Sequence, residues 1–233
     1  MLSDCAVPLT TDHDRNANMT TEEATAAPKL STRDRILAET AHLVAARGYH
    51  ETSTRDIAQC VGIRQPSLFH HFSAKEDIFK ELIRLSLEPA TIRAEKYAAL
   101  PGNASARLVA FLLEDLSDLL NPSFDIRGLF DEETLRAENF DQQRNDLYRY
   151  YAVVSSIVQQ GIDEGLFRDV SMSHFERLFR GILLATAWRR DSEGSADPNW
   201  PLFTIEYLLR GILRSPSSYP KILRAGQRLA SGS

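Results

Sequence analysis

The sequence has few cysteines and no long apolar run. Its 233 residues include only Cys5 and Cys60, which form no framework of closely spaced pairs. The longest apolar stretch, near residues 182–188, is far short of the ~20 residues that a membrane-spanning helix requires. The first thirty residues lack the basic-then-apolar order of a signal peptide. We therefore expect a cytoplasmic protein in a reducing compartment.

Motifs for catalysis and metal binding are also missing. The sequence has no Gly-rich phosphate loop, no H-E-x-x-H motif and no G-x-S-x-G elbow. Cys60, His70 and His71 could be considered as zinc ligands, but adjacent histidines point ~100° apart on a helix and no further ligand accompanies them. We predict no catalytic residue, no metal and no cofactor, and an enzyme remains only the alternative hypothesis.

Residues 52–72 carry the most informative pattern in the chain. Apolar residues recur at helical spacing between Thr54 and Val61, Gly62 ends that segment, and Gln65–Phe72 begins again with proline in its first turn. Two short helices joined at a glycine form a helix-turn-helix. In the second helix Leu68 and Phe72 define an inward side, which leaves hydroxyl, imidazole and aromatic groups outside. Such groups suit a DNA groove, although a partly buried helix of an ordinary bundle fits the same pattern.

Charge supports a DNA-binding end. The chain carries a net charge of −5, yet residues 31–80 hold seven Lys or Arg against six Asp or Glu, together with four of the six histidines. Among the segments 1–30, 31–80, 81–100 and 101–233, only 31–80 has a positive balance. Because the phosphate field is screened within about 10 Å, the rest of the protein need not be basic.

The same region resembles the TetR family of one-component repressors. The resemblance covers about fifty residues, Ser31–Lys80, and rests on Gly48-Tyr49, Thr54-Arg55-Asp56-Ile57-Ala58, Val61-Gly62-Ile63, Gln65-Pro66-Ser67-Leu68-Phe69-His70-His71-Phe72 and Ser73-Ala74-Lys75-Glu76. It implies an all-α protein with an N-terminal three-helix DNA-binding domain, followed by a helical ligand-binding and dimerisation domain, with about nine helices. It also implies a ligand-responsive repressor that binds a palindromic double-stranded DNA operator as a homodimer. A sensing module that has lost its DNA role is the further alternative.

Residue types and the resemblance together predict the DNA contacts. We expect Arg55 to read a guanine through two hydrogen bonds, and Gln65 to read an adenine. The alternatives are an Arg55 paired with a neighbouring carboxylate and a Gln65 that is a solvated helix start. Phe69 stands where the family usually has tyrosine, and it could press on a thymine methyl or a sugar. The full expected set is Thr54, Arg55, Arg64, Gln65, Ser67, Phe69, His70, His71 and Lys75, of which Thr54, Ser67, His71 and Lys75 are expected at phosphates.

Composition and helix signals divide the chain into four parts. Residues 1–29 are rich in Thr, Ala, Asp and Glu with few bulky apolar groups, which indicates a disordered tail. Residues 30–76 form the expected DNA-binding domain and residues 77–215 the expected effector-binding and dimerisation domain. Residues 216–233 begin with a proline and are rich in Ser, Gly and Arg, which indicates a flexible C-terminal tail.

The second domain should hold an effector pocket and a dimer interface. The resemblance implies that a ligand filling the pocket moves the recognition helices apart through the helix that begins near Ser73. Aromatic side chains favour a largely apolar pocket, so a hydrophobic or acyl-like effector and a drug-like one are both allowed. The expected pocket residues are Phe111, Asp115, Arg127, Tyr148, Tyr151, Phe179 and Trp188, with plain core as the alternative for the aromatics. The expected dimer residues are Phe175, Leu178, Ile182, Ala185, Ile205, Leu209 and Ile212, with an internal hairpin as the alternative.

Overall fold

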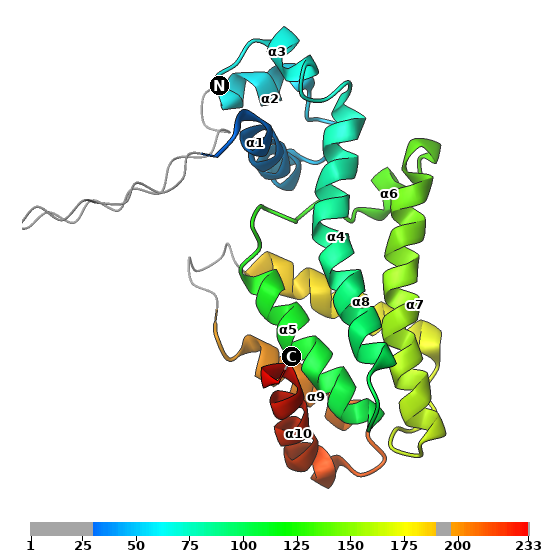
Figure 1. The fold of residues 1–233 in the computed structure, drawn as a ribbon. Coiled ribbons are helices and arrows are strands. Elements are labelled where there is room, and N and C mark those ends of the chain that lie inside the picture. Colours follow the sequence, from blue (N-terminus) through cyan, green and yellow to red (C-terminus); the bar gives the residue numbers. More distant parts are fainter. Residues whose placement is uncertain (1–29, 190–196, 233) are drawn as a thin grey trace, which may run out of the picture.

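The computed structural model describes residues 30–189 and 197–232, and the expected tail at 1–29 lies outside this part of the chain. The described residues form ten α-helices and two 3-10 helices, which confirms the all-α fold (Figure 1). Their bounds are α1 Thr32–Arg47, α2 Thr54–Val61, α3 Gln65–Phe69, α4 Lys75–Ala99, α5 Ala104–Leu120, α6 Glu132–Leu135, η1 Glu138–Phe140, α7 Asp141–Asp163, α8 Met172–Arg189, α9 Trp200–Ile212, η2 Pro216–Ser218 and α10 Tyr219–Ser231.

The first three helices pack together at one end of the molecule (Figure 1). Ser31 caps α1, because its hydroxyl accepts the Asp34 N–H at 3.1 Å. The apolar stripe of α1, the inner side of α2 and Leu68 of α3 share one core with the first turns of α4. This three-helix unit corresponds to the domain that we propose for residues 30–76.

Helix α4 joins this unit to the rest of the molecule without a break. Its 25 residues span about 37 Å. Its N-cap is Ala74, with no side-chain hydrogen bond, so Ser73 does not provide the cap that its spacing to Glu76 suggests. Pro89 lies inside the helix and lacks the N–H that would bond to the Leu85 carbonyl, which leaves α4 one backbone hydrogen bond short at that point.

Helix α5 is the centre of the larger part, because α4, α7, α8, α9 and α10 all contact it. Most of its residues are buried. The buried Arg107 donates to the Ala98 carbonyl at 2.8 Å and to Gln160 Oε1 at 2.6 Å, so one guanidinium ties the end of α4 to α5 and α7. Gly161 lets Phe167 cross α7 closely, since a Cβ there would lie 2.2 Å from the ring.

Helix α10 replaces the flexible tail that the sequence analysis expected for residues 216–233. Pro216 opens the 3-10 turn η2, and Pro220 lies in the first turn of α10, so neither proline stops the chain from becoming helical. Tyr219, Ile222 and Gly226 are buried against α5, where a Cβ on Gly226 would lie 2.4 Å from Val109. The expectation failed because it took Pro216 as an end signal and overlooked this apolar stripe.

Candidate nucleic-acid interface and cavity

Helix α2 is held by a reciprocal cap. The Ser53 hydroxyl accepts the Asp56 N–H at 3.2 Å, and Asp56 accepts the Ser53 N–H at 3.0 Å. Hydrogen bonding from the Ser53 hydroxyl, with help from Arg47 at 2.8 Å, lowers the pKa of Asp56. Asp56 is therefore engaged by Ser53 and Arg47, and Arg55 makes no ion pair within the described residues.

The turn between α2 and α3 depends on Gly62. Its φ of 75° is left-handed, a conformation that residues with a Cβ rarely adopt. Its N–H bonds to the Ala58 and Gln59 carbonyls, and the Arg35 guanidinium of α1 donates to the Val61 carbonyl beside it. The angle at which α3 leaves α2 is thus fixed from both sides.

Helix α3 is shorter than expected, since it ends at Phe69 and not at Phe72. Leu68 and Phe72 are buried as predicted, and Arg33 of α1 lies 4.9 Å from the centre of the Phe72 ring. His70 and His71 belong to the turn that follows the helix and are exposed. They therefore lie beyond the end of the recognition helix.

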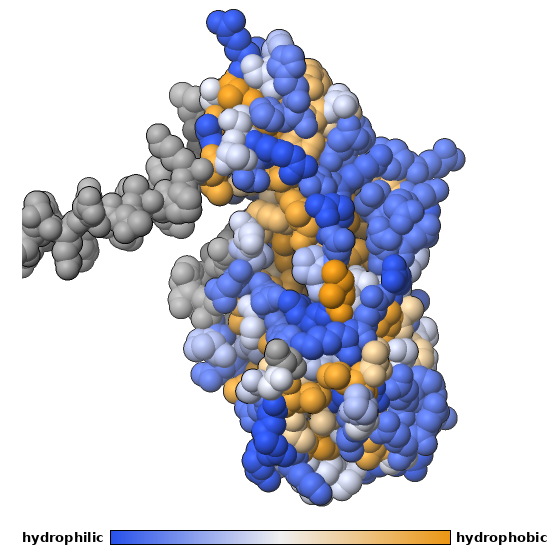
Figure 2. All heavy atoms as spheres, in the orientation of Figure 1, coloured by the Kyte–Doolittle hydropathy of each residue, from blue (hydrophilic) through white to orange (hydrophobic). Residues whose placement is uncertain are grey.

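The expected DNA-contact residues before Lys75 belong to α2, to α3 and to the turns beside them. Arg55, Arg64, Gln65, Phe69, His70 and His71 are exposed, and Thr54 and Ser67 are half-buried. Gln65 Nε2 donates to Thr54 Oγ1 at 2.9 Å, which fixes the first turn of α3 against the first turn of α2. Figure 2 shows mainly hydrophilic residues at this end of the molecule. Arg64, like Arg55, makes no ion pair in the part of the chain that the structure describes.

Lys75 has a different position from the one expected. Its ammonium donates to the carbonyls of Tyr49 and Thr52, each at 2.9 Å, and lies 4.0 Å from the centre of the Tyr49 ring. Burial lowers its pKa. In this conformation Lys75 holds the segment before α2 in place and does not present its charge to a phosphate.

Aromatic contacts connect this end to the rest of the fold. Tyr49 packs against Phe79 of α4 and Phe140 of η1, with ring centres 4.5 and 5.3 Å apart. Phe79 and Phe140 are themselves 5.3 Å apart. The Tyr49 hydroxyl donates to Glu76 at 3.0 Å, and burial raises its pKa. The loop before α2 is thus anchored to both the start of α4 and the start of α7.

A cavity of ≈ 760 Å³ lies between α4, α5, α7, α8 and the segment 121–132. Figure 2 shows a hollow with apolar atoms below α1, where α4 and α5 meet that segment. Its aromatic walls are Phe124, Phe130, Tyr150, Tyr151 and Trp188. A volume of this size with mostly apolar walls suits one small organic molecule.

A polar cluster lies in the wall of this cavity. The buried Asp115 accepts hydrogen bonds from Arg93 at 2.9 Å and from the Tyr150 hydroxyl at 2.6 Å. Arg93 also pairs with Asp118 and lies 3.5 Å from Glu114. Burial raises the pKa of Asp115 to about 6, although the bonds from Tyr150 and Arg93 oppose that shift.

Four of the seven expected ligand residues line the cavity: Asp115, Arg127, Tyr151 and Trp188. The other three do not. Phe111 and Phe179 are buried core, 6.4 Å apart between ring centres, because they lie on the sides of α5 and α8 that face other helices. Tyr148 is exposed on the outer side of α7. Sequence reasoning missed Arg93 and Tyr150, which only the packing of α4 and α7 against α5 brings to Asp115.

One wall of the cavity touches the three-helix unit of α1, α2 and α3. Gly128, which lines the cavity, has a φ of 79°, and a Cβ there would lie 2.9 Å from the Val44 carbonyl of α1. Only glycine allows this approach without displacement. The segment 121–132 is therefore in contact with both the cavity and α1.

The expected dimer residues divide into two groups. Phe175, Ile205, Leu209 and Ile212 are buried within the protomer, because α8 and α9 turn these sides toward α5, so they are not available to a partner. Leu178 and Ala185 are exposed and Ile182 is half-buried. Further exposed apolar groups that the sequence analysis did not choose are Leu184, Phe203 and Tyr207, with Gly181 and Gly211 in open space beside them.

Comparison with known proteins agrees with this geometry. Residues 36–82 match the family model described as "Bacterial regulatory proteins, tetR family". The HTH-type transcriptional repressor KstR2 of Mycobacterium tuberculosis is 30% identical over 142 residues, which are 59% of this chain and 70% of the relative. The crystal structure of Mycobacterium smegmatis AmtR is similar with a TM-score of 0.73 at 27% identity, covering 88% of this chain and 97% of that one. The structure of M. tuberculosis KstR2 gives 0.70 at 25% identity, covering 79% and 96%.

Within the described residues, no helix is both long enough and apolar enough to cross a membrane. KstR2 is described as a transcriptional repressor and as a ketosteroid transcriptional regulator.

Proposed function

The chain belongs to the tetR family of bacterial regulatory proteins, and from this premise we propose that it is a ligand-responsive repressor that binds a palindromic operator as a homodimer and is released by a small molecule. The observation that carries the proposal is the surface of α2 and α3. Two arginines without ion-pair partners in the described residues, Arg55 and Arg64, are exposed on a rigid, capped scaffold. Arginine in a groove can donate two hydrogen bonds to one guanine, which is the commonest specific contact to DNA.

A dimer is proposed through the exposed sides of α8 and α9. On α8, Leu178, Gly181 and Ala185 recur at intervals of three or four and so lie along one side of the helix. Leu178 is 56% exposed and Tyr207 of α9 is 70% exposed, which is costly for large apolar groups unless a partner covers them. Pairing through a two-fold axis would place two recognition helices on one face of the duplex.

The ligand is proposed to be a small, largely apolar molecule with one polar group that can reach Arg93, Asp115 or Tyr150. Release of DNA would follow from two contacts between elements that line the cavity and the three-helix unit. The segment 121–132, which lines the cavity, touches α1 at Val44. Helix α4 also lines the cavity, at Pro89, and its first turns carry Phe79, which packs against Tyr49. A ligand shifts the equilibrium only by its differential affinity for the two spacings of the recognition helices.

The test is a band shift with DNA from around the gene for this protein, in the presence of competitor DNA. The proposal expects a shifted band for the wild type and loss of selectivity for Arg55→Ala. Thermal-shift screening of small molecules then identifies candidates that stabilise the free protein, and a true effector should also dissociate the complex. If no shift occurs although the protein is folded, the sensing module without a DNA role becomes the better interpretation.

The dimer is tested separately by solution mass. The proposal expects a mass of two subunits for the wild type, and a lower mass for Leu178→Glu, because an unpaired carboxylate would be buried at the interface. Tyr148→Glu is the control, because Tyr148 is exposed on α7 and not on α8 or α9, and it should leave the mass unchanged. A wild-type mass of one subunit at working concentration would remove the homodimer from the proposal.

A further inference from the structure

The C-terminal end of the chain is strongly basic. Residues 207–233 contain five Lys or Arg and no Asp or Glu, whereas residues 101–206 contain ten basic and eighteen acidic residues. Over residues 101–233 as a whole, the acidic segment outweighs the basic one, which is why residues 31–80 alone stand out as positive when the chain is divided more coarsely. The positive balance at 207–233 is in fact larger than that of the DNA-binding unit.

Three of these cations form a stripe on α10. Lys221, Arg224 and Arg228 are exposed and make no ion pair within the described residues. The other two basic residues are engaged, since Arg210 pairs with Glu206 at 2.6 Å and Arg214 donates to the Phe167 carbonyl at 3.0 Å. We call Lys221, Arg224 and Arg228 the α10 stripe.

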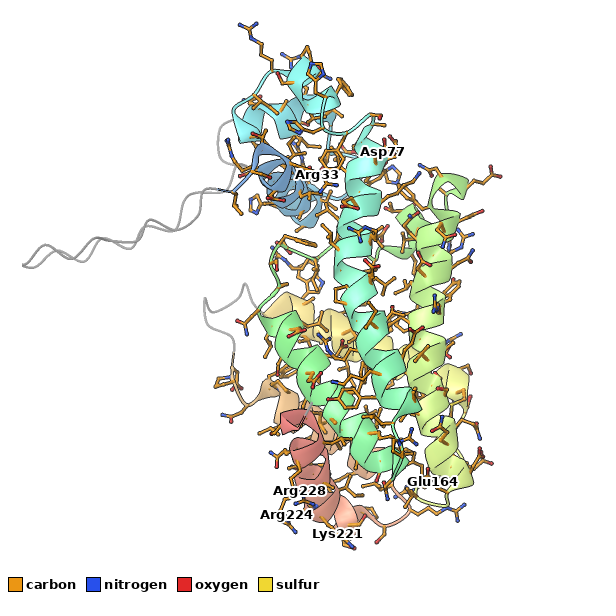
Figure 3. The ribbon with its side chains drawn as sticks, in the orientation of Figure 1. Arg33, Asp77, Glu164, Lys221, Arg224 and Arg228 are labelled. Atoms are coloured by element: carbon orange, nitrogen blue, oxygen red, sulfur yellow. The ribbon has the colours of Figure 1, made fainter. Side chains whose placement is uncertain are left out.

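The α10 stripe is held rigidly in place. Its members are three and four residues apart, so they share one side of the helix and extend over about 10 Å. The opposite side of α10 is packed against α5, with Gly226 in close contact with Val109. Figure 3 shows the three side chains on the outer side of α10, at the end of the molecule far from Arg33 and Asp77. A rigid helix loses little conformational entropy when its cations bind a ligand.

The chemistry of this surface excludes some partners. None of the large exposed apolar residues of the described chain lies on α10. A protein partner normally needs an apolar centre with aromatic residues, and a membrane-surface helix needs an apolar face for the lipid, but the apolar face of α10 is already buried against α5. Ser217, Gln227 and Ser231 are the other exposed groups nearby. Lysine, arginine, hydroxyl and amide groups without apolar residues are the types that contact DNA phosphates.

We propose that the α10 stripe binds the phosphate backbone of a second DNA duplex, without reading its sequence. The α10 stripe and the recognition surface lie at opposite ends of the molecule, separated by the length of α4, about 37 Å (Figure 1). One straight duplex on α3 therefore does not reach α10. The contact between α10 and phosphates does not depend on the proposed function. The joining of two duplexes by one protein does rest on the proposed function, because it requires an operator on the recognition surface.

The phosphate contact is tested in full-length protein that carries Arg55→Ala and Arg64→Ala, so that the recognition surface contributes little. Binding of a labelled duplex of random sequence is measured by fluorescence anisotropy across a series of salt concentrations. The α10 triple variant adds three further changes, Lys221→Gln, Arg224→Gln and Arg228→Gln. It should bind the duplex at least about tenfold more weakly at low salt. The slope of log K against log salt concentration should also become shallower by roughly 2 to 3, because each lost phosphate contact removes ~0.9 from the slope.

A matched control removes the same net charge elsewhere. Arg84→Gln, Arg136→Gln and Arg149→Gln change three exposed arginines that already pair with glutamates. This control should change the slope by less than about 1. Circular dichroism and the melting temperature establish that both triple variants are folded. Equal slopes for the two triple variants would overturn the proposal.

The second duplex is tested by capture. Wild-type protein bound to bead-attached DNA from around its gene should retain a second labelled duplex, and the α10 triple variant should bind the beads equally but retain none. Failure of the protein to bind the beads would count against the proposed function, whereas normal bead binding without capture would count against the α10 stripe. Binding of the wild type to vesicles of phosphatidylcholine and phosphatidylglycerol, without capture of DNA, would assign the stripe to a lipid surface and also overturn the proposal.

Discussion

Asp115 makes the stability of this protein depend on pH in a definite direction. Burial raises its folded-state pKa from 3.8 to about 6, so between these values the folded protein holds a proton that the unfolded chain releases. This contribution to the free energy of unfolding is fully present below pH ~4 and is lost as the pH rises through ~6. Between pH 5 and 7.5 the loss amounts to about 1.4 kcal/mol, since one pKa unit corresponds to ~1.36 kcal/mol.

Asp115→Asn removes this titration and keeps the shape of the side chain. We expect the difference in the free energy of unfolding between wild type and Asp115→Asn, measured by urea unfolding, to change by about 1.4 kcal/mol in that pH range, with the wild type relatively more stable at pH 5. Asp118→Asn is the control, because Asp118 also pairs with Arg93 but its side chain is 66% exposed. If the free energy of unfolding changed with pH in parallel for wild type and Asp115→Asn, the reasoning would be refuted, because the Asp115 carboxyl would then have the same pKa in the folded and unfolded states.

Three other substitutions test the interface and its connection to the cavity. Arg55→Ala should reduce the discrimination between operator and random DNA by about 1–3 kcal/mol in competition band shifts, and an equal loss on both would remove the base-reading role. Lys75→Ala should lower the melting temperature, because two loop carbonyls lose their donor. A reduced salt slope of DNA binding at an unchanged melting temperature would instead restore Lys75 to the phosphate contacts. Gly128→Ala should displace the segment 121–132 from Val44 and alter the effector concentration that releases DNA. Its control is Gly102→Ala, which has a φ of 107° but open space around it, so that equal effects in the two variants would show backbone strain alone.

Short-range signals in the sequence were sufficient to predict most of the local structure at the DNA-binding end. The glycine at 62 and the buried pair Leu68 and Phe72 depend on neighbours within a few residues, and the structure has them as predicted. Ser53 and Asp56 form the reciprocal cap that their spacing of three residues indicates. The end of α3 was placed three residues too late, because the hydrophobic period continues to Phe72 although the helix does not.

Where two sides of a helix are apolar, hydrophobic periodicity did not predict which side is buried within the subunit. The sequence predicted Ile205 and Leu209 at the dimer interface, and only the packing of α9 against α5 decides that these two are buried while Phe203 and Tyr207 are exposed. In the same way, the aromatic content indicated a pocket, but its lining depended on which helices meet.

The sequence by itself determined that this protein is all-helical, that a helix-turn-helix begins at Thr54 and turns at Gly62, and that Leu68 and Phe72 face inward, because capping, turn chemistry and helical period act over a few residues. Tertiary structure alone decided that Arg93, Asp115 and Tyr150 meet, that Lys75 turns inward to two carbonyls, and that the last residues form α10. Each of these depends on contacts between segments far apart in the chain, where the free energy of burial, and no local preference, selects the partner.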